Sequence, residues 1–127
     1  MPRYDASAYD PPAPVAEVGL RAVGSSDTAT TFSAQMLIDS GADVTLLPRA
    51  AVLRVGVQPQ MGAQYELIGF DGNRTKADAV DLEMILLNKA FRGRYLLIDA
   101  DHGILGRDVL ASVSLLLDGP RQEWSAV

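Results

Sequence analysis

Short runs of alternating apolar and polar residues recur along the chain, which is the pattern of half-buried β-strands. One run covers residues 15–23, and a second, rich in threonine, covers residues 28–38, with a Gly-Ser-Ser-Asp turn between them. Two such runs around a polar turn predict a hairpin. Its second strand delivers Asp39, so a carboxylate is expected at the end of an apolar strand.

A second hairpin is predicted in the middle of the chain, where residues 65–68 precede the pair Asp71-Gly72. Asp-Gly is a favoured tight-turn pair because both residues tolerate positive φ. Farther along, the alternation over residues 80–87 gives way to continuous apolar residues. A turn at Asn88-Lys89 then predicts that residues 91–98 return as the next strand.

Helical signals are short. Pro48 suits the first turn of a helix over residues 49–55, and residues 107–112 can form another short helix. Residues 113–117 and 122–127 flank an Asp-Gly-Pro turn, which predicts a terminal hairpin. The expected fold class is therefore all-β, with one or two short helices.

The first residues differ in composition from the rest of the chain. Residues 1–14 contain four of the seven prolines among small and polar residues, which favours a flexible, Pro-rich arm. Residues 15–127 are expected to form one domain with a modest core, since 48% of the 127 residues are hydrophobic.

Charge and cysteine content exclude several classes of function. The net charge of −5 and the pI near 4.6 disfavour nucleic acid and anionic membranes as partners, because both repel an acidic protein. The absence of cysteine rules out thiol catalysis, zinc-thiolate sites and disulfides. No signal-peptide pattern and no membrane-length apolar run is visible, so a cytoplasmic location is the default expectation.

Two segments carry the candidate chemistry. Residues 36–48 read M-L-I-D-S-G-A-D-V-T-L-L-P, and residues 102–110 read H-G-I-L-G-R-D-V-L. Burying the Asp39 carboxylate costs desolvation free energy, which the Ser40 hydroxyl and the backbone amides admitted by Gly41 can offset. In order and spacing, the two segments resemble the catalytic loop and the apolar-apolar-Gly element of retropepsin-like aspartic peptidases. The resemblance covers roughly residues 15–124.

The resemblance implies a closed β-barrel equivalent to one half of a pepsin. Only one Asp-Ser-Gly is present, whereas the family's chemistry uses two carboxylates that share a proton around a water molecule. It therefore implies a homodimer in which Asp39 of each subunit meets its counterpart on a two-fold axis. The expected activity is peptide-bond hydrolysis on a peptide or protein substrate, with no metal or organic cofactor. The terminal hairpin resembles that of cellular and bacterial members.

The same resemblance assigns further residues. The region around residues 65–72 matches the flap that closes over bound peptide, although the viral flap is richer in glycine. Asp43 can contact a substrate backbone, as the matching family residue does, or pair with Arg107, and the two roles are compatible. The expected support of the catalytic loop comes from Ser40, Gly41 and Ala42. The expected substrate contacts are Asp43, Ile68, Gly69, Phe70, Ile104 and Leu105.

Other interpretations of the sequence remain open. The chain can be a non-catalytic dimeric binding or assembly module that kept the fold. A Ser-His-Asp triad is disfavoured, because the single histidine, His102, lies far from Ser40 in the sequence. Asp99, Asp101 and His102 fit no calcium-loop spacing, and a solvated turn is the commoner reading. Trp124 is expected to pack among the terminal strands or contact a second subunit.

Overall fold

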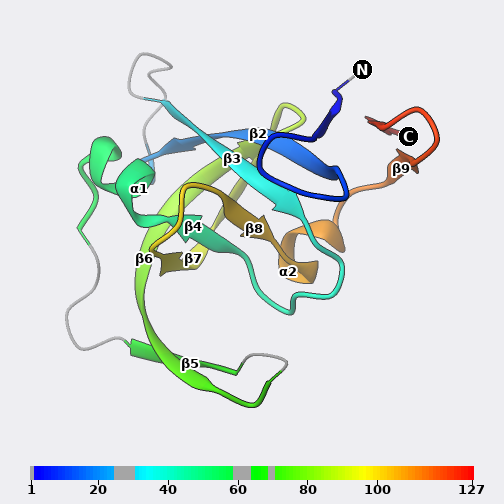
Figure 1. Cartoon of the computed structure of the whole chain (residues 1–127). Helices are drawn as coiled ribbons and strands as arrows, with labels where there is room; N and C mark the ends of the chain where they lie inside the picture. The colour runs from blue at the N-terminus through cyan, green and yellow to red at the C-terminus, as the bar shows by residue number, and fades with distance from the viewer. Residues whose placement is uncertain (1, 25–30, 59–63, 69–70) are drawn as a thin grey trace.

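The computed structural model describes residues 2–24, 31–58, 64–68 and 71–127 (Figure 1). Within these ranges most of the ordered backbone is β-strand, and two short helices lie against the strands. The first and last described segments lie side by side, because the Trp124 amide donates to the Pro2 carbonyl over 3.0 Å. The predicted turn at residues 24–27 lies largely outside the described residues.

Six strands among the described residues form a closed barrel. The ring closes because β2 pairs with β6 as well as with β3, which joins the first and last of these six strands. Two contacts in the ring are parallel, β3 with β8 and β4 with β7. In ring order the strands are β2 (Ala13–Arg21), β3 (Phe32–Ile38), β8 (Gly103–Leu105), β4 (Leu46–Pro48), β7 (Lys89–Ile98) and β6 (Arg74–Leu86).

The core fills the interior of this barrel. Alternate residues of the strands point inward, as Val18 and Leu20 do on β2 and Leu82 and Met84 do on β6, and all four are buried. Burial of each large apolar side chain stabilises the fold by about 1.5–3 kcal/mol. Burial also raises the pKa of Tyr95 to about 12, and its hydroxyl donates to the Phe91 carbonyl over 2.7 Å.

The predicted middle hairpin is present as β5 (Gln64–Ile68) paired with the first half of β6, and it projects beyond the barrel (Figure 1). Ile68 pairs with Arg74, and Gly72 adopts φ 82°, a conformation open to glycine at little cost. The Asp71 carboxylate accepts from the Asn73 amide over 3.0 Å and fixes the turn. Gly69 and Phe70 lie outside the described residues.

The turn between β6 and β7 lies one residue earlier than the predicted Asn88-Lys89. Leu86 pairs with Lys89, which leaves Leu87 and Asn88 as the turn, with φ 52° and 63°. Positive φ at both positions is the backbone of a two-residue hairpin turn that matches the strand twist. The prediction that Leu87 continues the apolar strand is therefore wrong, because strand register overrode the apolar pattern.

Helix α1 (Arg49–Val55) has the predicted bounds, and Gly56 ends it in the left-handed conformation with φ 86°. Pro48 is the last residue of β4 and precedes the helix, so its predicted place in the first turn is wrong. Helix α2 (Arg107–Leu110) is shorter than the predicted 107–112. Neither helix of the described chain is long and apolar enough to cross a membrane.

The two ends of the chain pack together outside the barrel. The predicted terminal hairpin is present as β9 (Leu115–Asp118) and β10 (Glu123–Ala126). Trp124 on β10 is buried and donates from its indole to the Val15 carbonyl over 3.0 Å, so it packs within its own chain. Strand β1 (Tyr4–Asp5), within the predicted arm, pairs with the start of β2. The division into an arm and a domain stays a prediction.

Candidate active site

Asp39 lies where the adjacent ends of two parallel strands meet. Ile38 at the end of β3 is opposite Leu105 at the end of β8, and the Asp39 amide donates to the Leu105 carbonyl over 3.1 Å. The strands therefore fix the backbone at the point where the carboxylate begins. Its side chain is neither fully buried nor fully exposed, so it is held by protein and still reachable from solvent.

A tight turn follows Asp39 and surrounds its carboxylate with backbone. The Gly41 amide donates to Asp39 Oδ1 over 3.0 Å, and the Ala42 amide donates to the Asp39 carbonyl over 3.1 Å. A Cβ atom on Gly41 would lie 3.2 Å from Asp39 Oδ1, a tighter approach than most side chains accept. The glycine therefore keeps the space beside the carboxylate open while its amide offsets lost hydration.

Arg107, the first residue of α2, contacts the turn that follows Asp39 from the other side. Its amide donates to the Ala42 carbonyl over 2.9 Å, and its guanidinium donates to the Ser40 carbonyl over 2.7 Å. The expected ion pair with Asp43 is present. The two side chains are 52% and 83% exposed, so the ion pair itself contributes little stability in water. The guanidinium contacts Ser40 and Asp43 together, so it attaches both ends of the turn to α2.

Thr45 and Asp108, two residues that the sequence analysis did not single out, connect the loop to α2 more deeply. Thr45 is only 1% exposed, and its hydroxyl donates to Asp108 Oδ1 over 2.7 Å while accepting from the Gly106 amide over 3.0 Å. The Thr45 amide donates to the second Asp108 oxygen over 3.1 Å. A polar residue between apolar Val44 and Leu46 was the available signal.

Glycine is required at two positions of the apolar-apolar-Gly segment by close packing. A Cβ atom on Gly106 would overlap the Val44 backbone, and one on Gly103 would overlap the Leu46 carbonyl and the Met36 sulfur. Backbone atoms cannot move aside as flexible side chains do. The two glycines therefore let β8 pass close enough to the loop for its hydrogen bonds to form.

The fold of this chain is similar to that of a solved retroviral protease. The EIAV protease complexed with the inhibitor HBY-793 matches the chain with a TM-score of 0.59 and 22% sequence identity. The match covers 79% of this chain and 86% of that protease. The chain has the fold of a retroviral protease. The predicted retropepsin-like, all-β barrel with two short helices is thus confirmed. No protein-family model and no curated protein sequence matches the chain.

Within the retroviral-protease fold, the predicted substrate contacts differ in exposure. Ile68 is exposed at the end of β5, and Ile104 on β8 is partly exposed. Leu105 is fully buried and belongs to the core, so it supports the site from beneath. Gly69 and Phe70 are outside the described residues. Contact of these residues with a peptide stays a prediction.

The residues considered for a Ser-His-Asp triad or a metal cluster make other contacts. His102 is paired with Tyr9, whose hydroxyl lies 3.2 Å from His102 Nδ1, and the two rings are tilted with centroids 5.7 Å apart. Asp99 forms an ion pair with Arg49 over 2.8 Å. Across the described part of the chain, no group of three or more His, Asp or Glu side chains, Asp99, Asp101 and His102 included, could hold a metal ion.

Proposed function

We propose that this chain is an aspartic endopeptidase that works as a homodimer, with Asp39 of each subunit forming the catalytic dyad. The observation that carries the proposal is the position of Asp39. It begins an Asp-Ser-Gly turn where β3 and β8 end side by side, in a barrel with the fold of a retroviral protease. A carboxylate held by strands but reachable from solvent can take a proton from a bound water.

The proposed reaction uses the two Asp39 carboxylates in different protonation states. Two acids that face each other across the axis share one proton, because both cannot remain charged at short range. The ionised carboxylate removes a proton from water, which attacks the scissile carbonyl, while the protonated one donates to the carbonyl oxygen. The tetrahedral intermediate then collapses: the amine leaves with the proton that the first carboxylate took from water, and the proton on the carbonyl oxygen returns to the second carboxylate. Neither step needs a metal or an organic cofactor.

The single chain supplies one carboxylate, so the dyad requires assembly. The terminal hairpin offers a contact surface, since Leu116 and Leu117 on β9 are half exposed and the outer edge of β9 has no partner among the described strands. An isologous contact through this hairpin would leave both loops free to meet.

The proposed substrate is an extended peptide held beneath the β5–β6 hairpin. An extended chain can hydrogen-bond to loop and hairpin backbone, while side chains enter pockets on alternate sides. Ile68 and Ile104 present apolar surface for this role, and Asp43 offers a carboxylate beside the loop. An apolar preference next to the cleaved bond follows from these neighbours.

The decisive variant is Asp39→Asn. The amide keeps nearly the same shape and still accepts from the Gly41 amide, but it cannot act as a base. We expect proteolysis of a mixed peptide library, followed by mass spectrometry between pH 4 and pH 7, to fall to background. The thermal unfolding midpoint and dimer mass should stay unchanged. Glu17→Gln, which makes the same carboxylate-to-amide change on the exposed face of β2, is the control and should cleave normally.

Two outcomes would contradict the proposal. Wild-type cleavage rates in purified Asp39→Asn would remove Asp39 from the reaction. A wild-type dimer that binds peptides but cleaves none of the library would favour the non-catalytic binding module instead.

A further inference from the structure

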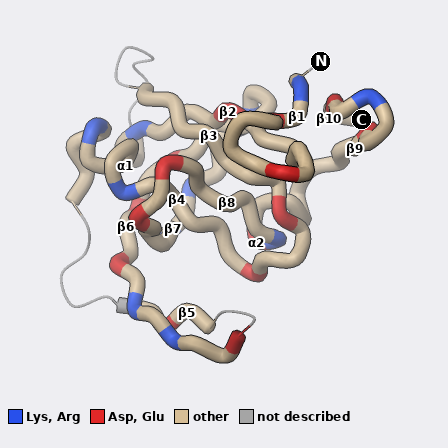
Figure 2. The backbone as a smooth tube through the Cα atoms, viewed as in Figure 1, with Lys and Arg blue, Asp and Glu red and all other residues tan. Residues whose placement is uncertain are grey.

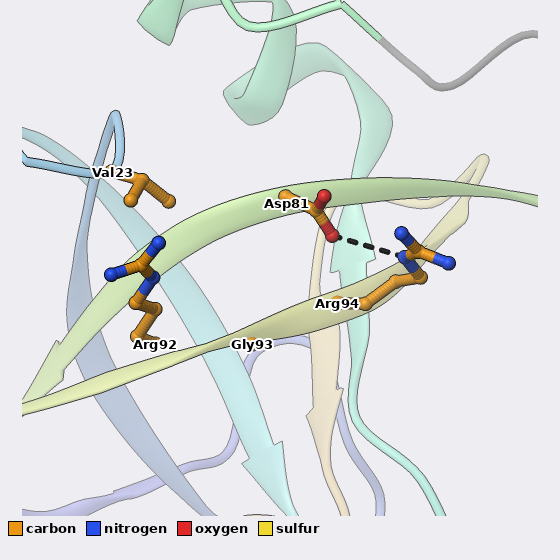
Figure 3. Close-up of a pocket in the computed structure, with 5 residues that line it drawn as sticks. All are labelled: Val23, Asp81, Arg92, Gly93 and Arg94. Atoms are coloured by element: carbon orange, nitrogen blue, oxygen red, sulfur yellow. Dashed lines mark hydrogen bonds and ion pairs between the residues drawn. The ribbon is translucent and has the colours of Figure 1, made fainter.

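A hollow of about 670 Å³ lies beside strands β6 and β7 (Figure 3). It is lined by Asp81 on β6, by Arg92, Gly93 and Arg94 on β7, and by Val23, which follows β2. Val23 lies beyond the end of β2 where Leu20 pairs with Phe32, whereas Asp39 follows the opposite end of β3. The seven residues of β3 separate the two places by about 20 Å.

The hollow presents two guanidinium groups on one face. Arg92 and Arg94 are two positions apart on a strand, so their side chains leave the same side of the sheet about 7 Å apart. Gly93 between them faces the other side of the strand, where a Cβ atom would meet the buried Tyr95 ring. In Figure 3 the Arg92 side chain extends toward Val23, while the Arg94 side chain turns toward Asp81.

Arg92 and Arg94 differ in how many of their N–H groups already donate hydrogen bonds within the protein. Arg94 donates from Nε to Asp81 over 3.0 Å and from one terminal nitrogen to the Tyr65 hydroxyl over 3.3 Å, which leaves other N–H groups of its five. Arg92 forms no ion pair with any carboxylate of the described residues. Among the described residues no carboxylate contacts the Arg92 guanidinium directly, and the Glu83 charge acts on it only through space.

The acid opposite Arg92 is Glu83, and it forms hydrogen bonds with other residues. Glu83 pairs with Arg92 in strand register, but its carboxylate accepts from Arg21 over 2.8 Å and from the Gly24 amide over 3.4 Å. These two hydrogen bonds lower the pKa of Glu83, so it stays ionised and bound to them. Arg92 thus remains available to a ligand in a protein whose overall charge is −5.

We propose that this hollow binds an acidic segment of another polypeptide in an extended conformation. One carboxylate of the segment pairs with Arg92, and a second, two residues along, reaches the unused donors of Arg94. Alternate residues of an extended peptide lie about 7 Å apart on one side, the same spacing as the two arginines. Val23 contacts an apolar residue of the segment, a role that a phosphodiester chain cannot fill.

Charge favours a short acidic peptide over a nucleic acid. Lys and Arg residues are interspersed with Asp and Glu over the molecule (Figure 2), and the overall charge of −5 repels a long polyanion. A peptide with two local acids meets Arg92 and Arg94 while bringing little further negative charge. The site is independent of the proposed peptidase activity, since binding requires no hydrolysis and no Asp39.

The test is direct binding of a fluorescent peptide containing Val-Ser-Asp-Ser-Glu, whose Val, Asp and Glu lie on one side when extended, to Asp39→Asn protein, followed by anisotropy at low ionic strength. We expect saturable binding that weakens at least threefold when the two acids become Asn and Gln. Arg92→Gln should weaken binding of the acidic peptide by about two- to fivefold, the upper part of the range of an exposed ion pair. Arg121→Gln, which removes an equal charge from the distant terminal turn, is the matched control and should bind normally.

A gain-of-affinity variant separates the hollow from general charge attraction. Asp81→Asn removes the carboxylate that holds Arg94, so the acidic peptide should bind a few-fold more tightly. Equal weakening by Arg92→Gln and Arg121→Gln, or no saturable binding, would overturn the proposal. Arg92-dependent binding of a single-stranded oligonucleotide without binding of the acidic peptide would also overturn it. Unfolding midpoints of all variants exclude loss of fold as the cause.

Discussion

Individual residues around Asp39 are constrained chiefly by backbone packing. Gly106 shows this clearly, because a methyl group in its place would overlap the Val44 backbone. Gly106 also donates its amide to the buried Thr45 hydroxyl over 3.0 Å, which requires close approach. The absence of a side chain at this position is therefore a geometric condition for the conformation of the loop that follows Asp39.

Gly106→Ala should destabilise the protein. We expect the free energy of unfolding in urea to fall by about 1–3 kcal/mol, because the overlap forces backbone segments apart. Gly119→Ala is the control, since a Cβ atom there meets nothing within 4 Å, and it should change stability by less than about 0.5 kcal/mol. Equal stabilities of the two variants would show that the loop and β8 are not closely packed.

Sequence reasoning at the residue scale proposed Asp39, Ser40 and Gly41 as site residues and predicted the Asp43–Arg107 ion pair, because these residues stand in the two segments that resemble the family motifs. It did not find Thr45 or Asp108. These two residues are 63 positions apart and meet because Thr45 directly precedes β4, β4 pairs with β8, and α2 follows β8. The spacing of these two residues along the chain does not predict their contact.

At the scale of elements, two short segments hold the active-site loop. Helix α2 is hydrogen-bonded to the turn through Arg107, and Thr45, the residue before β4, is hydrogen-bonded to Asp108 of α2. The Arg107–Asp43 pair is exposed, whereas Thr45 is buried with both its hydroxyl and its amide bonded. The buried contact should therefore carry more of the stability than the ion pair.

Thr45→Val tests this ranking with a residue of nearly the same shape. Valine leaves the Gly106 amide and an Asp108 oxygen without their hydroxyl partner, so unfolding in urea should cost about 1–3 kcal/mol less. Thr75→Val, the same change on the exposed part of β6, should leave stability within about 0.5 kcal/mol. The loss in free energy of unfolding for Arg107→Ala should lie between the losses for Thr45→Val and Thr75→Val. A Thr45→Val protein as stable as wild type would mean that the buried hydroxyl is dispensable.

Most elements followed from local pattern, but several boundaries did not. Helix α1 and the hairpin around Gly72 were predicted because Pro, Gly and alternating residues act locally. The turn at Leu87-Asn88 was misplaced, since the pairing of Leu86 with Lys89 is a property of two strands together. Strand β4 was missed because its three residues gain strand geometry only from β7 and β8.

At the scale of the whole molecule, the barrel creates one half of the proposed site. The β2–β6 contact closes the ring and fixes β3 beside β8, so Asp39 is held in a defined place. The second carboxylate has to come from another subunit in the proposed mechanism. Assembly and catalysis should therefore depend on each other.

Mixing subunits tests this dependence. If wild-type and Asp39→Asn chains are combined in equal amounts and allowed to exchange, about one quarter of the dimers should be wild-type pairs by random association. Heterodimers hold one ionisable acid and cannot divide the two proton-transfer roles, so activity per wild-type chain should fall to about half. Mixing with Glu17→Gln chains should leave activity per chain unchanged. Activity proportional to wild-type chains alone would show that each chain works by itself.

The sequence by itself determined the strand-rich class, the Asp-Ser-Gly turn after an apolar strand and the glycines near β8, because alternation, turn chemistry and backbone freedom are local properties. Only the tertiary structure decided that β2 closes the barrel on β6, that Thr45 meets Asp108, and that Arg92 stands beside a hollow. These features depend on packing between segments far apart in the chain. Their energies arise when the barrel closes and cannot be assigned to any one segment.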